Sequence, residues 1–370
     1  MTERAPKRII LAVTSDLTYD QRMIRIATSL QSAGYDVTLV GRERQVSTQL
    51  MQQRYQQHRI PVTKDSTKLM YAVFWWKLFW WLLRRKADAI CAIDLDTSPP
   101  VWLASWLKRI PCVYDAHELF AEQEEVIRRP ATYRMWRAIE KFTVRRFRYG
   151  YTVSESYVDF FRKKYNRTYA VVRNATVLRP PVVADKPQRY ILYQGAVNKG
   201  RCFESLIPAM QWVDCRLLII GDGNFMEQAQ RLAHQHQLDD KVVFKGYVAP
   251  RELPRYTERA TVGITLFVAS SLSNELSLAN RFFDYMHACV PQLGVRYPEY
   301  ARINSQYEVA VLLDKVTPET VASALNNMLQ DTERYAHMQR ECLRAREVYC
   351  WQEEEKRLLG VWAQVFANNG

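Results

Sequence analysis

A polar loop that runs into a helix holds the side chains best suited to bind a phosphorylated ligand. Residues 279–289 have helical spacing, and Ser277 in the loop before them is a candidate N-cap. Asn280, Asp284 and His287 recur on one face of this helix, opposite an apolar face. The N–H groups at the helix start suit a phosphate, and Asp284 can accept hydrogen bonds from sugar hydroxyls. Periodicity alone leaves open an ordinary surface helix with a solvated polar face.

A second candidate is the loop Gly195-Ala-Val-Asn-Lys-Gly-Arg, which ends at Arg201. It lies between a predicted strand and a predicted helix. Backbone N–H groups, together with the cations Lys199 and Arg201, can hold a diphosphate in such a place. The alternative is a basic loop that is simply solvated.

Acidic side chains and a histidine follow two predicted strands in the first half of the chain. Asp94 and Asp96 come after one strand, and His117 and Glu118 come after the next. Because α/β proteins bind ligands at the carboxyl ends of parallel strands, these residues are candidates for substrate contacts. A lone histidine serves the structure more often than the chemistry, so both roles stay open for His117.

Alternating strands and helices must position these side chains. In the first half we predict strands over residues 8–14, 36–41, 87–93, 111–115 and 151–154, and helices over 19–33, 98–107, 133–147 and 157–164. In the second half we predict strands over residues 190–195, 215–221, 241–246, 260–267 and 291–294, and helices over 203–210, 225–236, 250–258, 318–329, 333–348 and 351–366. The alternation predicts two Rossmann-like α/β domains, residues 1–178 and 179–350, with residues 351–370 as a final helix. The first loop lacks a G-x-G-x-x-G fingerprint, which disfavours a dinucleotide.

The positive charge of the chain is confined to its first half. Residues 1–180 hold 31 Lys and Arg against 17 Asp and Glu, whereas residues 181–370 hold 21 and 22. This surface suits a phosphorylated lipid, a nucleic acid or an anionic acceptor. We disfavour nucleic acid, because no recognition motif is present.

The remaining composition points to a protein of the cytoplasm. The 7 cysteines are scattered without metal-ligand spacing, which indicates reduced thiols and no metal site. The opening MTERAPKR leads directly into a strand-like run, so we expect no signal peptide.

Residues 69–83, LMYAVFWWKLFWWLL, form the most aromatic stretch and are followed by Arg84, Arg85 and Lys86. The stretch is too short to cross a bilayer. It is either a buried core helix or a helix that lies on a membrane surface. With the basic helix over residues 133–147, it predicts that the first domain docks on an anionic membrane.

The segment SLANRFFDYMHACVPQL resembles the donor-site helix of the group 1 (family 4) glycosyltransferases of GT-B fold. That family holds its nucleotide-sugar with a Glu-x7-Glu segment or with the variant Ser-x-Pro-Asn-Lys-x-x-Glu-Tyr. Asp284 matches the second glutamate, which binds the ribose in the family, and Asn280 with Arg281 matches the Asn-Lys pair. Ala279 stands where the variant has proline, and Leu276 stands where the family has its first glutamate.

Other stretches resemble the same family, in matching order. Tyr-Asp-Ala-His-Glu is a common form of the family segment whose histidine reaches the donor sugar. Arg201 fits the family residue that neutralises the diphosphate, and Cys202 stands where the family usually has glycine. The resemblance implies His117, Arg201 and Asp284 as catalytic residues. It implies contacts to the nucleotide-sugar from Gly195, Lys199, Gly221, Tyr247, Ser277, Leu278, Asn280 and Arg281. It implies an acceptor side made by Asp20, Arg22, Asp94 and Glu118.

From this resemblance we expect a GT-B fold, with two Rossmann-like domains facing a central cleft and a C-terminal helix that returns to the first domain. The implied activity is retaining, metal-independent glycosyl transfer without a cofactor, in cell-surface polysaccharide or glycoconjugate synthesis. The donor is a UDP-sugar or, as second choice, a GDP-sugar, and the acceptor is a glycan or a lipid-linked molecule. A nonhydrolysing sugar-nucleotide epimerase of the same fold, or a GT-B scaffold without catalysis, is the alternative.

Overall fold

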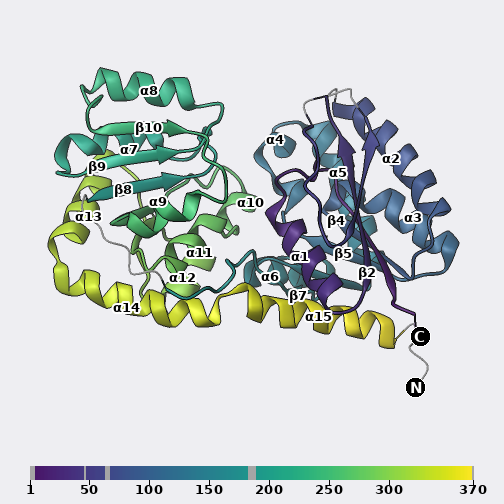
Figure 1. Cartoon of the computed structure of the whole chain (residues 1–370). Coiled ribbons are helices and arrows are strands. Elements are labelled where there is room, and N and C mark those ends of the chain that lie inside the picture. Colours follow the sequence, from purple (N-terminus) through teal and green to yellow (C-terminus); the bar gives the residue numbers. More distant parts are fainter. Residues whose placement is uncertain (1–4, 46, 63–66, 182–188, 369–370) are drawn as a thin grey trace. The chain divides into compact units, whose positions relative to one another are not determined.

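The computed structural model describes residues 5–45, 47–62, 67–181 and 189–368. The chain divides into two units (Figure 1). Unit 1 comprises Met1–Arg173 and Glu354–Gly370, and unit 2 comprises Asn174–Glu353. The boundaries expected from the sequence were after residues 178 and 350. The expected cleft between the domains stays a prediction.

Unit 1 is built on a seven-stranded parallel sheet in the order β3-β2-β1-β4-β5-β6-β7. The strands are β1 (Arg8–Ala12), β2 (Asp36–Glu43), β3 (Gln56–Pro61), β4 (Ala89–Ile93), β5 (Cys112–Ala116), β6 (Tyr149–Thr152) and β7 (Ala170–Val171). Ile9 of β1 lies opposite Val37 on one side and Ala89 on the other. The central strands are apolar because helices cover both faces of the sheet. The strand order reverses between β1 and β4, which is where Rossmann-like sheets bind ligands.

The helices of unit 1 connect these strands. They are α1 (Gln21–Ser32), α2 (Thr67–Arg84), α3 (Ser98–Lys108), α4 (Glu124–Ile127), α5 (Pro130–Arg146) and α6 (Glu155–Tyr165). The helix predicted over residues 69–83 is confirmed as α2, and its side chains divide between two environments. Phe74, Leu78 and Leu82 are fully buried, whereas the exposed fraction is 64% at Trp76 and 38% at Trp80. Among the residues described, no helix is long and apolar enough to span a bilayer.

The last helix, α15 (Trp351–Ala367), returns the chain to unit 1, as the resemblance implied. Glu354 is fully buried and accepts hydrogen bonds from the backbone N–H of Arg173 (3.0 Å) and from its guanidinium (3.2 Å). Trp362 is fully buried as well, and Phe366 stacks on Tyr35 with ring centroids 5.6 Å apart. This helix therefore completes the core of unit 1.

Unit 2 repeats the architecture with a six-stranded parallel sheet in the order β10-β9-β8-β11-β12-β13. Its strands are β8 (Tyr190–Gln194), β9 (Arg216–Ile220), β10 (Val242–Gly246), β11 (Val262–Thr265), β12 (Gln292–Val295) and β13 (Ala310–Leu313). Its helices are α7 (Phe203–Ala209), α8 (Met226–Gln235), α9 (Leu253–Arg259), α10 (Leu272–Glu275), α11 (Asn280–His287), α12 (Pro298–Asn304), α13 (Pro318–Gln330) and α14 (Thr332–Val348). The order reverses between β8 and β11. Two Rossmann-like α/β domains are thus confirmed.

Candidate functional site

Two glycine-containing loops meet at the carboxyl edge of the sheet in unit 2. A Cβ at Gly221 would lie 1.8 Å from the carbonyl oxygen of Gly195, and both residues have positive φ angles, 139° and 124°. The N–H of Gly195 donates to Ile220 (2.9 Å), and the N–H of Val197 donates to Asp222 (3.0 Å). Only glycines permit this contact, so the loops after β8 and β9 form a close-packed backbone platform.

Two arginines stand beside this platform. Arg281 is 8% exposed, donates to the carbonyl of Gln194 (3.0 Å) and lies over the Tyr193 ring at 4.6 Å. Arg201 lies over the Phe267 ring at 5.9 Å. Burial and the nearby Arg281 lower the pKa of Arg201. Within the described residues neither guanidinium has an acidic partner. The two charges therefore create a partly desolvated site for an anion.

Asp284 extends this set from the second turn of α11. One carboxylate oxygen accepts from the Thr176 hydroxyl at 2.7 Å, and the other accepts from the Gln194 amide at 3.2 Å. Thr257 in turn donates to the Gln194 oxygen at 2.7 Å. The carboxylate is half-buried, and the Thr176 hydroxyl and the Gln194 amide help to orient it.

The start of α11 differs from its prediction. The N-cap is Ala279, whose N–H donates to the Tyr300 hydroxyl at 2.7 Å, while Ser277 donates to the carbonyl of Asn274 at 2.8 Å. The assignment of Ser277 as cap is therefore wrong, because a side chain from another helix binds the N-terminal N–H group. Leu278 is buried in the core and offers a ligand only its backbone, whereas Asn280 is exposed.

His287 corrects the polar face expected for α11. It is 8% exposed, and its Nε2 lies 2.9 Å from the carbonyl oxygen of Tyr349. Burial, reinforced by Arg346, lowers the pKa of His287 to about 4. Helix α14 packs against the side of α11 that holds His287. His287 thus belongs to the packing between the two helices.

The remaining unit 2 candidates lie at the same edge or close to it. Lys199 is exposed, and its N–H donates to the Asn224 side chain at 3.1 Å. Tyr247 follows β10 and is 63% exposed. Cys202, at the N-cap of α7, has φ 58° and ψ 27°. This left-handed conformation explains why glycine suits the position.

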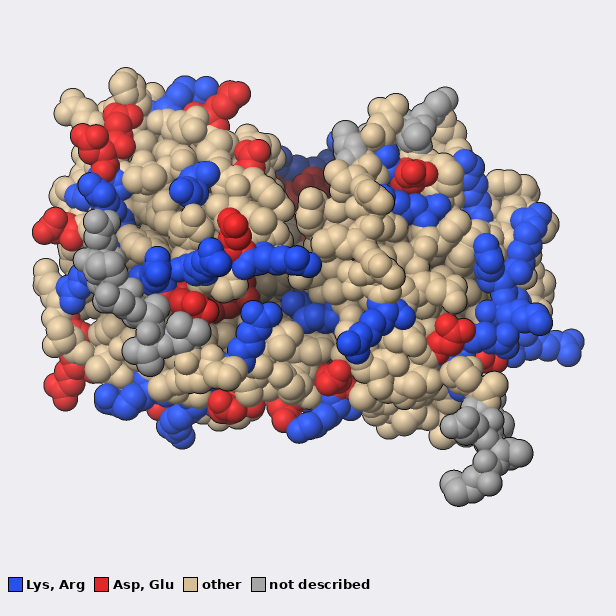
Figure 2. Space-filling view, viewed as in Figure 1, with Lys and Arg blue, Asp and Glu red and all other residues tan. Residues whose placement is uncertain are grey.

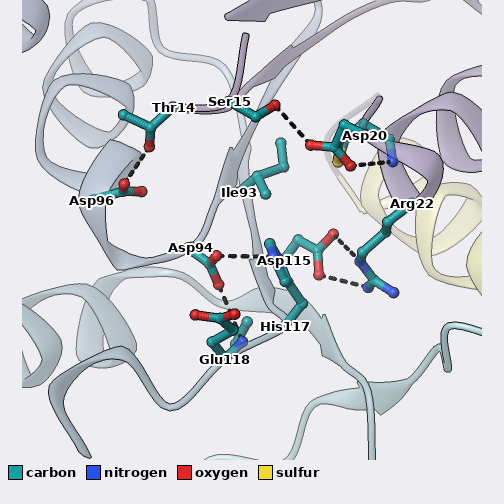
Figure 3. Close-up of polar contacts among 12 residues, drawn as sticks. Thr14, Ser15, Asp20, Arg22, Ile93, Asp94, Asp96, Asp115, His117 and Glu118 are labelled. Atoms are coloured by element: carbon teal, nitrogen blue, oxygen red, sulfur yellow. Dashed lines mark hydrogen bonds and ion pairs between the residues drawn. The ribbon is translucent and has the colours of Figure 1, made fainter. Parts of the chain in front are cut away.

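The candidates of unit 1 also meet at the carboxyl edge, beside the reversal between β1 and β4 (Figure 3). Nε2 of His117 lies 3.1 Å from Oδ2 of Asp94, and the N–H of Glu118 donates to Oδ1 of Asp94 at 3.2 Å. Asp94 has a positive φ of 58°. Burial and the neighbouring carboxylates, Glu118 first, raise its pKa well above the ordinary value. The strained backbone turns this carboxyl group toward the imidazole.

Asp96, which follows β4 as Asp94 does, is a further candidate from the sequence. Thr14 donates to its Oδ2, while Oδ1 is buried and has no partner among the described residues. Burial raises the pKa of Asp96 to about 7, although the Thr14 hydrogen bond acts in the opposite direction. Its position after an apolar strand was the only signal in the sequence. Across the described residues, no group of three His, Cys, Asp or Glu could hold a metal ion.

Asp20 and Arg22 hold the framework under this cluster. Asp20 caps α1, accepting from the N–H of Met23 (3.1 Å) and from Ser15 (2.7 Å). Arg22 is 5% exposed and forms a two-pronged ion pair with Asp115, at 2.7 and 3.1 Å. Arg22 is therefore buried and does not lie on a solvated helix face. Both residues thus hold α1 and the strand ends of this edge together.

Two family models match successive parts of the chain. The glycosyl transferase 4-like domain matches residues 19–175, and the glycosyl transferases group 1 model matches residues 175–342. The chain belongs to the group 1 glycosyltransferases. No curated protein sequence matches it.

Solved structures show the fold of this glycosyltransferase. Sucrose-phosphate synthase (tll1590) from Thermosynechococcus elongatus covers 98% of this chain over 100% of its own, at 15% identity and a TM-score of 0.80. The structure of Anabaena Alr3699/HepE in complex with UDP and glucose matches 97% of this chain and 100% of its own chain, at 14% identity and a TM-score of 0.76. The structure of a putative UDP-N-acetylglucosamine 2-epimerase from Listeria monocytogenes matches 98% of this chain and 98% of its own chain, at 11% identity and a TM-score of 0.69. The GT-B fold is thereby confirmed.

Proposed function

We propose that this glycosyltransferase uses a nucleoside-diphosphate sugar, with UDP as the first choice of nucleotide and GDP as the second. The observation that carries the proposal is the pair Arg201 and Arg281, two neighbouring guanidinium groups with no acidic partner in the described part of the chain. They stand at the reversal of the unit 2 sheet, beside loops whose glycines expose backbone. A diphosphate supplies the negative charge that this site lacks.

The same groups suit the chemistry of glycosyl transfer. As the bond between sugar and diphosphate breaks, negative charge grows on the leaving oxygen. Cations fixed beforehand in a water-poor site stabilise that charge more strongly than water does. In this proposal Arg201 and Arg281 hold the leaving group, Asp284 accepts hydrogen bonds from the ribose, and Gly195 and Gly221 bring backbone close to the ligand. Lys199, Tyr247, Leu278 and Asn280 complete the contacts.

We assign the unit 1 cluster to the transferred sugar and its acceptor. His117, oriented by Asp94, offers an imidazole to a sugar hydroxyl, and Glu118 stands at the acceptor side. The acceptor proposed is a glycan or a lipid-linked molecule of cell-surface polysaccharide synthesis. Transfer is proposed to be retaining and metal-independent, in the cytoplasm, with an anionic membrane surface as a partner.

Binding and turnover test this function. Calorimetry with UDP, GDP, ADP and CMP should show one preferred nucleotide, and the matching nucleotide-sugar should release that nucleotide only when an acceptor extract is added. Analysis of the sugar then separates transfer from epimerisation, since an epimerase changes the donor without an acceptor. Failure of all four nucleotides to bind would overturn the proposed donor site.

A further inference from the structure

Helices α2 and α3 of unit 1 expose apolar side chains in short stripes. On α2, Trp76 and Trp80 are four residues apart and are 64% and 38% exposed. On α3, Trp106 is 62% exposed and stacks on Trp102, with ring centroids 6.1 Å apart. Leu107, beside it, is 50% exposed. Residues four apart share a helix face, so each helix presents an apolar stripe to solvent.

The two stripes belong to one surface. The ammonium group of Lys108, at the end of α3, donates to the carbonyl oxygens of Leu83 (3.1 Å) and Arg85 (2.8 Å), at the end of α2. The C-termini of the two helices are therefore joined. Figure 1 shows α2 and α3 on the same side of the unit 1 sheet.

Cations surround these stripes at the helix ends. Exposed basic residues close α2, α3 and α5, and they are Arg84, Arg85, Lys86, Arg109, Arg145 and Arg146. Within the described chain none of them forms an ion pair. Figure 2 shows Lys and Arg gathered on the side where Figure 1 places α2 and α3. Their shared position has a topological cause, because helices run antiparallel to the strands and so end at the amino edge of the sheet.

Aromatic rings and cations also line a groove between α2 and the edge strand β3. Its volume is about 670 Å³, and Trp76, Trp80, Trp81, Arg84 and Arg85 are among its walls. The guanidinium groups of Arg84 and Arg85 each lie 5.3 Å from a tryptophan ring. The groove thus combines apolar depth with positive charge at its rim.

We propose that the face formed by α2 and α3, with its basic rim, docks on an anionic lipid bilayer. Tryptophan and leucine stripes that end in cations match a bilayer interface, where rings sit at headgroup depth and cations meet phosphate. A nucleic acid would use the cations but leave the leucine and tryptophan stripes without a partner. The basic rim lies at the amino edge of the unit 1 sheet, whereas Asp94, His117 and Glu118 lie at its carboxyl edge.

Vesicle flotation tests this surface on the full chain. The protein should float with phosphatidylglycerol vesicles at about 0.05 M salt, and weakly or not at all with phosphatidylcholine vesicles. Replacing Arg84, Arg85 and Lys86 together by Ser should lower partitioning about a hundredfold. A matched control replaces Arg216, Arg231 and Arg340, three exposed arginines of unit 2, by Ser. The control removes the same charge and should float like the parent.

A second variant pair tests the apolar part. Trp76→Ser with Trp106→Ser should reduce flotation and also the quenching of tryptophan fluorescence by brominated lipid. UDP affinity and the thermal transition, measured in parallel, should stay those of the parent. The proposal would be overturned if the unit 2 control lost flotation to the same extent, or if the protein floated equally well with neutral vesicles. It would also be overturned if the protein bound duplex DNA at about 0.15 M salt and did not float.

Discussion

At the scale of single residues, the two units divide the chemistry between different kinds of group. Within the described residues, unit 2 offers two guanidinium groups, Arg201 and Arg281, that have no acidic partner and so suit an anion of fixed charge. Unit 1 offers carboxyl groups and an imidazole, which exchange protons and hydrogen bonds with hydroxyls. Arg201 is an example of the first kind of group and His117 of the second. Replacing Arg201 should therefore damage nucleotide binding, and replacing His117 should damage turnover.

Arg201→Ala should weaken UDP binding, since it removes a charge-assisted contact worth roughly 1.5–3 kcal/mol, or about 10- to 100-fold in affinity. His117→Ala should leave UDP affinity unchanged and lower kcat, because the imidazole belongs to the other unit. Isothermal calorimetry and nucleotide release measure the two effects. Arg216→Ala, at an exposed arginine of unit 2, is the control for Arg201. Equal losses of UDP affinity in the Arg201 and His117 variants would contradict this division.

The raised pKa of Asp96 predicts a pH dependence of stability. The folded pKa of about 7 exceeds the ordinary value of 3.8, so the folded protein binds the proton more tightly than the unfolded chain. Stability contributed by the protonated form is therefore complete below pH 4 and is lost as the pH rises toward 7. Asp96→Asn should remove this decline, with a slope of at most about 1.4 kcal/mol per pH unit. Urea unfolding from pH 4 to pH 8 measures it, and an unchanged slope in the variant would refute the assignment.

At the scale of elements, the sequence identified most apolar strands and amphipathic helices, and it missed edge strands of both sheets. The edge strand β3, QQHRIP, was not predicted because only Ile60 in it is buried. β13 was also missed. The start of α11 was placed too early because the Tyr300 hydroxyl, and not Ser277, accepts its first N–H. Gln194 and Thr176 were missed at the site, since nothing local in the sequence links them to Asp284.

The packing of α11 against α14 predicts a pH dependence of stability that is opposite in sign to the one predicted for Asp96. His287 has a folded pKa of about 4, below the ordinary value of 6.5, because it is buried. Its neutral form stabilises the fold, and this contribution is lost as the pH falls from about 6.5 to about 4. His287→Gln should flatten that acid limb, and a urea titration over this range checks it. An acid limb that stays as steep in the variant would show that other groups cause it.

At the scale of the whole molecule, the chain crosses between two separately packed units, and unit 1 is discontinuous. Removing residues 354–370 should strip unit 1 of buried Trp362 and of the Glu354 ion pair. We expect the thermal transition of unit 1 to fall by several degrees while that of unit 2 is kept, since a lost large buried side chain costs about 3–5 kcal/mol. UDP at 100 times its Kd should add about 2.7 kcal/mol to unit 2. Scanning calorimetry resolves both effects. If UDP raised the transition of unit 1 and not that of unit 2, the assignment of the nucleotide to unit 2 would be wrong.

The return of α15 to unit 1 also fixes an order of events during biosynthesis. A ribosome releases residues 1–173 first, then all of unit 2, and only afterwards the segment that contains Trp362. Domains of a growing chain usually fold in the order in which they emerge. Here the domain that begins first is completed last. While unit 2 is being translated, the apolar surface of unit 1 against which α15 packs stays uncovered and accessible to chaperones.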